Sequence, residues 1–230
     1  MKIDICYITS TPHLESHASL GQRQLSLSAA QMSLPDEICA IDILFNGADT
    51  VDSVRDFCKF VNKKDQSLYE TTKFMAIPQG RTQVEWLDCY EELVRMDNID
   101  VIGLSKLSVP ESFQGNHTES GNCTKGRIKC IDFLIEHDMT PDKFGKETHL
   151  LGSDNAGINE LTYYYSMGYD WIRSNDTSMP FVYGYTGNKI ENRLVDDIVL
   201  EKLDFSKQLS MLELKTVDDN FIAWRTINVD

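Results

Sequence analysis

Short apolar runs alternate along the chain with longer stretches in which apolar residues recur at helical spacing. A short apolar run without polar alternation is typical of a strand that is buried on both faces. On this basis we predict six strands, over residues 3–8, 38–45, 74–77, 101–104, 150–151 and 169–172.

The stretches between these runs predict helices. In one of them Val51, Val54, Phe57 and Val61 recur every three or four positions, which places them on one face of a helix. The same criterion predicts helices over residues 26–32, 51–62, 83–96, 125–137 and 159–167. Beyond residue 187 we expect a helix over residues 189–214, then a short strand or a helical turn over residues 221–227.

Strands that alternate with helices indicate βα units and parallel pairing. The chain carries no internal repeat, linker or low-complexity tract, so we expect a single domain over residues 1–230. The fold class that we predict is α/β, a TIM-type (β/α) barrel. Six or seven strands fall short of the eight in a full barrel. Either the barrel is incomplete or further strands are hidden in the C-terminal part.

The net charge of the chain bears on whether it binds nucleic acids. Acidic residues number 36 and basic residues 22, which gives a net charge of −14. A negative surface repels phosphate backbones, so the charge disfavours tight binding of tRNA or DNA by this chain alone. The sequence does not decide whether a partner protein or a second copy of the chain completes the barrel.

The remaining composition points to a cytoplasmic protein without a metal or a cofactor. No apolar run approaches the ~20 residues of a membrane span, and residues 1–13 do not form a signal peptide. Six cysteines stand singly along the chain, which predicts buried thiols in a reducing compartment. His13 and His17 lack the HExxH pattern of a zinc site, and neither GxGxxG nor GxxxxGK[ST] occurs.

Polar side chains follow several of the predicted strands at the point where each strand ends. Gln79, Ser105 and Asp176 are examples, and Asp42 lies within the second predicted strand. The carboxyl ends of parallel strands meet at one edge of the sheet, where ligands bind. Amides and carboxylates there could hold a flat hydrogen-bonding ring such as a nucleobase, and a carboxylate could act as nucleophile or base. Taken one by one, such residues are more often turn formers and helix caps; their coincidence favours a site.

A polar, glycine-rich stretch over residues 114–126 follows the fourth predicted strand. We expect it to be a long loop on the ligand-binding side. It is either a surface loop or a lid over the site.

Four motifs in this order resemble the tRNA-guanine transglycosylase superfamily. They are IPQGRT (77–82), VIGLS (101–105), THLLGS (148–153) and GYDWIRSNDTSMPF (168–181). The resemblance covers about residues 38–181, and is nearest to short divergent bacteriophage members and to DNA 7-deazaguanine transglycosylases. It implies a (β/α)₈ barrel that exchanges guanine for a 7-deazaguanine through a covalent bond to an aspartate.

The resemblance also assigns roles to individual residues. Asp176 matches the aspartate nucleophile, and Asp170 is the second choice. The resemblance also implies a set of substrate-binding residues that contact the purine or 7-deazaguanine base. These residues are Asp42, Gln79, Gly80, Gly103, Leu104, His149 and Gly152.

Two departures from the family bear on its substrate. The tRNA enzymes carry a zinc site of three cysteines and a histidine near the C-terminus, whereas the last cysteine here is Cys130. The family's general-base aspartate has no clear counterpart, with His13 and Glu15 the nearby candidates. The sequence therefore leaves two hypotheses open. One is an active base-exchange pentosyltransferase acting on tRNA or DNA. The other is a catalytically inactive phage barrel that binds a nucleotide-like small molecule or a host protein.

Overall fold

A single parallel sheet of five strands lies at the centre of the structure, which is a computed structural model that describes residues 20–119, 121–153, 157–190, 206 and 208–226. The strands follow one another across the sheet in chain order. They are β1 (Glu37–Cys39), β2 (Lys73–Ala76), β3 (Val101–Ser105), β4 (Glu147–Leu151) and β5 (Ile172–Asn175). The α/β class and the parallel pairing are thus confirmed. The six or seven strands expected are not seen in these ranges, and the strand predicted over residues 3–8 lies outside them.

Two predicted strands have other boundaries in the structure. The strand predicted over residues 38–45 ends at Cys39, although the Ala40 N–H still donates to the carbonyl of Met75 in β2. Farther along, the Thr50 hydroxyl bonds to both the N–H and the carbonyl of Ile43. Phe45 then takes a left-handed φ of 61°. The run 169–172 precedes β5: Tyr169 still bonds through its N–H to the carbonyl of Tyr164 in the preceding helix. The strand predicted over residues 150–151 is longer and begins at Glu147.

Helices follow the strands in the chain, and they include all five that were predicted up to residue 167. In chain order they are α1 (Leu20–Ser33), α2 (Gly47–Lys64), α3 (Gln66–Thr71), α4 (Gln83–Val94), α5 (Ser108–Gln114), α6 (Asn122–Glu136), the 3₁₀ turn η1 (Pro141–Phe144), α7 (Gly157–Ser166), α8 (Met179–Tyr185) and α9 (Met211–Thr226). None of these helices is long and apolar enough to cross a membrane, as far as the described chain extends.

The long loop predicted over residues 114–126 is shorter in the structure. Gly115, with a φ of 72°, ends α5, and α6 begins at Asn122. Gly126 belongs to α6, where a side chain would collide with the backbone of Pro110. The glycine content of this stretch therefore reflects close helix packing as well as a turn.

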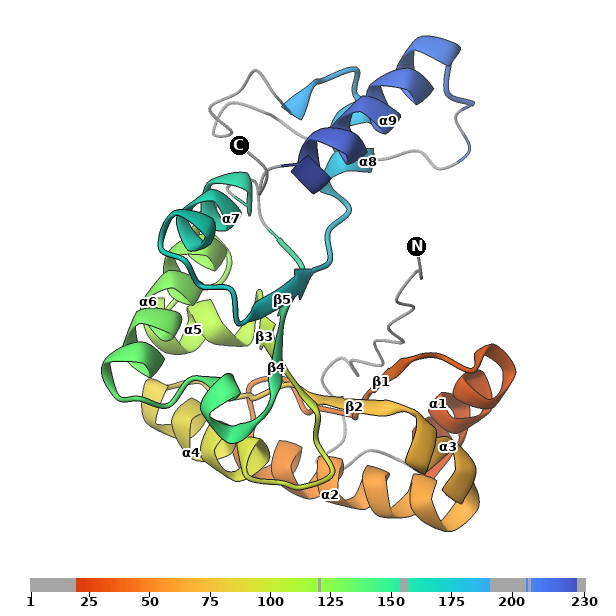
Figure 1. The fold of residues 1–230 in the computed structure, drawn as a ribbon, viewed down its shortest axis with the longest axis vertical. Coiled ribbons are helices and arrows are strands. Elements are labelled where there is room, and N and C mark those ends of the chain that lie inside the picture. The colour runs from red at the N-terminus through yellow and green to blue at the C-terminus, as the bar shows by residue number, and fades with distance from the viewer. Residues whose placement is uncertain (1–19, 120, 154–156, 191–205, 207, 227–230) are drawn as a thin grey trace.

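The C-terminal prediction falls partly outside the described residues, which omit most of residues 189–214. The predicted helix end at residue 214 is wrong, because α9 is continuous from Met211 to Thr226. Of the two alternatives expected for the run 221–227, the helical one holds, since residues 221–226 are the last turns of α9. It packs on α8, where Gly184 allows close contact with Val217. The two helices lie together at one end of the molecule (Figure 1).

The main core lies between the sheet and the helices that cover its outer face (Figure 1). Ile38, Phe74, Ile102 and Leu150 pack toward these helices. Alternate residues along the same strands point to the opposite face, where a smaller apolar cluster contains Cys39, Met75, Ile77, Val101 and Leu151.

Ion pairs join strands across this inner face. Arg173 of β5 contacts Glu37 of β1 at 2.7 Å and also pairs with Glu147 of β4, which in turn pairs with Lys73 of β2 at 2.6 Å. In a flat sheet β1 and β5 would lie about 19 Å apart, four times the ~4.8 Å strand spacing. One arginine and one glutamate cannot bridge that distance. The sheet therefore curves strongly, and its two edges approach each other on the inner face.

Candidate functional site

Polar groups gather where the strands end. Asp176 directly follows β5, and Gly152 directly follows β4. Ser105 closes β3, while Asp42 and Gln79 lie three residues beyond β1 and β2. Because the strands are parallel, these positions share one edge of the sheet.

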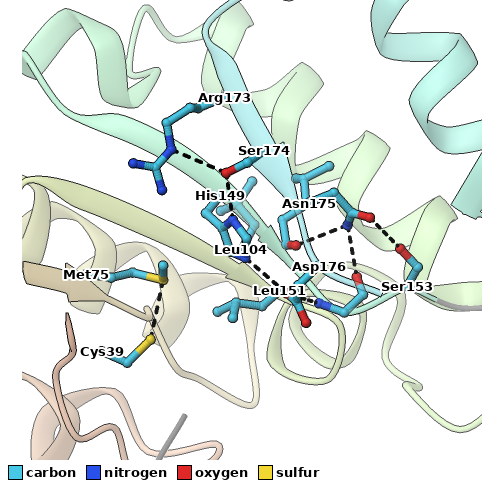
Figure 2. Close-up of polar contacts among 12 residues, drawn as sticks. Cys39, Met75, Leu104, His149, Leu151, Ser153, Arg173, Ser174, Asn175 and Asp176 are labelled. Atoms are coloured by element: carbon cyan, nitrogen blue, oxygen red, sulfur yellow. Dashed lines mark hydrogen bonds and ion pairs between the residues drawn. The ribbon is translucent and has the colours of Figure 1, made fainter. Parts of the chain in front are cut away.

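The Asp176 carboxylate receives two hydrogen bonds. Its Oδ1 atom accepts the backbone N–H of Gly152 at 2.8 Å and lies 3.0 Å from His149 Nε2 (Figure 2). Burial raises the pKa of Asp176, but these two hydrogen bonds, together with electrostatic attraction from His149 and Arg127, outweigh it and hold the pKa below its usual value. The side chain is still 47% exposed. Asp176 is therefore an ionised carboxylate that a substrate can reach.

His149 lies within a chain of hydrogen bonds that ends on Asp176. Its Nδ1 atom is 2.8 Å from the hydroxyl of Ser174, which in turn accepts the Nε–H of Arg173 at 3.3 Å (Figure 2). A neutral imidazole that carries its proton on Nε2 satisfies every link, since Ser174 then donates to Nδ1 and His149 donates to Asp176. Because an ionised carboxylate can only accept, His149 donates to Asp176 from Nε2.

Asn175 ties the ends of β4 and β5 together. Its amide nitrogen donates to the carbonyl of Leu150 at 3.0 Å, and its amide oxygen accepts the Ser153 hydroxyl at 3.2 Å. The backbone N–H of Asp176 also bonds to Leu150. The segment that carries Asp176 is thus held by its backbone and by its neighbours.

Asp42 and Gln79 form a second, buried pair. Gln79 Nε2 donates to Asp42 Oδ2 at 2.5 Å, and Gln79 Oε1 accepts the backbone N–H of Phe45 at 3.1 Å. Burial raises the pKa of Asp42 to about 6, against the opposing effect of hydrogen bonds from its own backbone and from Gln79. The two side chains predicted to contact a base are therefore brought together, with Gln79 bonded through Nε2 to Asp42 and through Oε1 to the backbone.

The glycine positions and Leu104 have packing roles in the structure. A side chain on Gly80 would collide with the backbone of Trp86, and one on Gly103 would collide with Leu151. The side chain of Leu104 lies in the main core. Their predicted contacts with a base stay predictions.

Asp170 is not brought to this edge of the sheet. It lies in the exposed turn before β5, at the opposite end of the strand from Asp176. There it lines a cavity of about 330 Å³ together with Tyr164, Tyr165 and Tyr169.

Sequence reasoning missed a buried ion pair behind the site. Arg127 of α6 and Glu160 of α7 contact each other at 2.7 Å, with side chains 0% and 1% exposed. The available signal was the position of Arg127, three and four residues before the apolar Cys130 and Ile131 on one helix face. A charge at such a position requires a buried partner.

Metal chemistry gains no support from the described residues, in which no three His, Cys, Asp or Glu side chains gather at a distance suited to a metal ion. The five cysteines of this part of the chain are buried and form no disulfide. His13, His17, Glu15 and Cys6 lie outside it. No protein-family model and no curated protein matches the chain.

Proposed function

We propose that this protein is a base-exchange transglycosylase in which Asp176 is the nucleophile. The observation that carries the proposal is the state of Asp176, which is ionised, reachable and held by two donors at the carboxyl end of β5. A carboxylate nucleophile needs this combination, because it attacks in its ionised form and must reach the substrate.

We further propose a (β/α) barrel as the architecture of the whole chain. Two features support it. Each strand neighbours its predecessor in the chain, whereas a doubly wound sheet reverses its strand order at a switch point. The contact between Arg173 and Glu37 supports a sheet that curves toward closure.

The proposed reaction has two displacement steps. Asp176 forms a bond to C1′ of a nucleoside while the C1′–N bond to the purine breaks. The electron pair leaves with the base, which takes up a proton. An incoming guanine or 7-deazaguanine loses a proton, forms the new C1′–N bond and releases the carboxylate. Asp42 and Gln79 would hold the bases by hydrogen bonds, and the Asp42 carboxyl, with a pKa of about 6, could both accept and donate near neutral pH.

A second candidate is a catalytically inactive barrel that binds a nucleotide-like molecule or a host protein. The net charge of −14 favours it, since it opposes the approach of a polymer. The closed contact between Asp42 and Gln79 favours it too, because a base would have to compete with that hydrogen bond.

Base exchange with labelled guanine separates the two candidates. The protein is incubated with the label and with tRNA or DNA, and incorporation is measured together with any denaturation-resistant complex between protein and polymer. Asp176→Asn should lower incorporation by on the order of 10³-fold or more and abolish the complex.

Asp170→Asn is the matched control, because it removes a carboxylate at the opposite end of β5 and should leave incorporation unchanged. Full incorporation by Asp176→Asn would contradict the enzyme. No incorporation by the wild type into either polymer, with base binding unaffected by Asp176→Asn, would support the binding protein.

A further inference from the structure

Arg127 donates hydrogen bonds to the ends of two strands. Its Nη1 atom lies 3.2 Å from the carbonyl oxygens of both Leu104, in β3, and Leu151, in β4. Its Nη2 atom bonds to Glu160 Oε2 at 2.7 Å, and Glu160 Oε1 accepts the hydroxyl of Tyr164 at 2.9 Å. The guanidinium is thus fixed from the helix layer against the strand ends that form the site.

One peptide group connects Arg127 to Asp176. The carbonyl of Leu151, which Arg127 contacts, and the N–H of Gly152, which donates to Asp176 at 2.8 Å, are the two ends of the same peptide unit. Hydrogen bonds in a row polarise one another in a medium of low dielectric constant. A buried cation on the carbonyl therefore makes the N–H a stronger donor to the carboxylate.

The guanidinium of Arg127 is oriented toward these carbonyls, and this orientation costs free energy. The Nε atom of Arg127 is buried without a hydrogen-bond partner among the residues described, and a buried unpaired donor is unfavourable. A buried ion pair is itself weak evidence for stability, since apolar residues of similar size often replace it without loss. The contact with the strand ends accounts for the arrangement better than stability does.

We propose that Arg127 is a positioning residue for Asp176 and acts through the peptide group that joins Leu151 to Gly152. The inference rests on the proposed function in so far as it takes Asp176 to be the reacting carboxylate. The contact itself does not depend on the identity of the substrate.

Other charged groups near Asp176 stay in place when Arg127 is changed. His149 bonds to the carboxylate from β4, and Arg173 of β5 belongs to the same chain of hydrogen bonds. The aliphatic part of Lys106 packs over Gly152. Variants confined to Arg127 and Glu160 therefore isolate the effect of this ion pair on Asp176, which includes the direct attraction of the Arg127 charge.

The test compares three variants with the wild type. Arg127→Met with Glu160→Gln removes both buried charges, keeps the side-chain volumes similar and leaves an acceptor for Tyr164. Arg127→Lys keeps the cation. Glu160→Gln alone keeps Arg127 and is the matched control. Urea unfolding first establishes that each variant is folded.

The first readout is the titration of Asp176, followed by carboxyl ¹³C NMR and assigned with Asp176→Asn. The titration midpoint should rise in the Arg127→Met, Glu160→Gln variant. It should return toward the wild-type midpoint in Arg127→Lys, and it should not rise in Glu160→Gln. An unchanged midpoint in the folded double variant would overturn the proposal.

The second readout is base exchange. In the double variant kcat should fall on the order of tenfold, with KM changed less than about twofold, because orientation is lost and binding is kept. The acid limb of its pH profile should move to higher pH. If the wild type exchanges no base, the proposed function fails, while the NMR titration still decides the role of Arg127.

Discussion

Arg173 and Glu37 are 136 positions apart in the chain, yet Arg173 Nη2 lies 2.7 Å from Glu37 Oε2. This contact joins the last described strand of the sheet to the first across the inner face. Glu37 is buried, so it has little water to replace a lost partner.

Arg173→Met should destabilise the fold by about 1–3 kcal/mol, because it leaves the buried Glu37 without its cation. Urea unfolding near neutral pH measures the loss. The control is Arg55→Met, which breaks the exposed pair with Glu92 between α2 and α4 and should cost no more than about 1 kcal/mol. If both variants lose the same free energy of unfolding, the contact across the inner face stabilises the fold no more than an exposed ion pair does.

Asp42→Asn should stabilise the protein at pH 7. The pKa of Asp42 is about 6 in the folded chain, against ~3.9 for an unfolded aspartate. Between these values the folded state binds the proton more tightly, so the free energy of unfolding falls as the pH rises. At pH 7 the buried charge costs on the order of 3 kcal/mol.

The gain in Asp42→Asn should therefore be largest at pH 7 and vanish below about pH 4. Urea unfolding at intervals of one pH unit measures it. Asp88→Asn removes one exposed carboxylate from α4 and serves as the control. Parallel stability curves for Asp42→Asn and the wild type would contradict the buried, proton-binding Asp42.

His149→Leu should move the acid limb of base exchange to higher pH. The hydrogen bond from His149 helps to hold the pKa of Asp176 below its usual value, so the wild-type carboxylate stays ionised further into the acid range. Without that donor Asp176 takes up its proton at a higher pH and stops acting as a nucleophile. The pH dependence of kcat/KM measures the shift.

Ser174→Ala tests a different use of the same side chains. Ser174, His149 and Asp176 are linked in the order of a serine triad. In the proposed reaction the serine orients His149, so its loss should lower kcat by about tenfold or less. Complete inactivation by Ser174→Ala, with activity left in Asp176→Asn, would instead make serine the nucleophile.

The cysteines should react slowly in the folded protein. Burial raises the pKa of Cys58 and of Cys89 to about 12, and the thiolate is the reactive form. With a thiol reagent at pH 8 these two residues should stay unmodified for as long as the protein is folded, whereas all six cysteines react in urea. Mass spectrometry of the labelled peptides identifies each site. Rapid labelling of Cys58 or Cys89 in the native protein would contradict the prediction.

The spacing of apolar positions predicted the helices well where local pattern and packing agree. The helix after Thr82 is an example, since Thr82 caps it by accepting the N–H of Glu85. The same reasoning placed Asp42 and Gln79 at one edge of the sheet, where they are in contact.

The pattern was wrong where apolar residues serve a tertiary contact instead of a strand. The apolar run at Tyr169 and Trp171 serves packing on a helix. Tyr169 packs on Tyr163 and Tyr164 of α7, and Trp171 packs on Tyr169. The strand begins only afterwards, at Ile172. A one-dimensional pattern records that a side chain is buried, but not which element buries it.

For the same reason, the pattern along the chain did not predict which side chains from distant segments pair with each other. Arg127 and Glu160 are 33 positions apart, and neither residue type nor spacing identifies one as the partner of the other. The hydrogen bond from Gly152 to Asp176 comes from a backbone group, which no side-chain motif reports.

The sequential order of the strands also has a consequence for how the chain folds. Each of β2 to β5 pairs with the strand that precedes it, so the sheet can grow outward as successive segments leave the ribosome, without waiting for a distant partner. The bond between Arg173 and Glu37 joins the first and last described strands, so we expect it to form last. Its loss should accordingly speed unfolding and leave the folding rate nearly unchanged, which makes this contact a determinant of the lifetime of the native state.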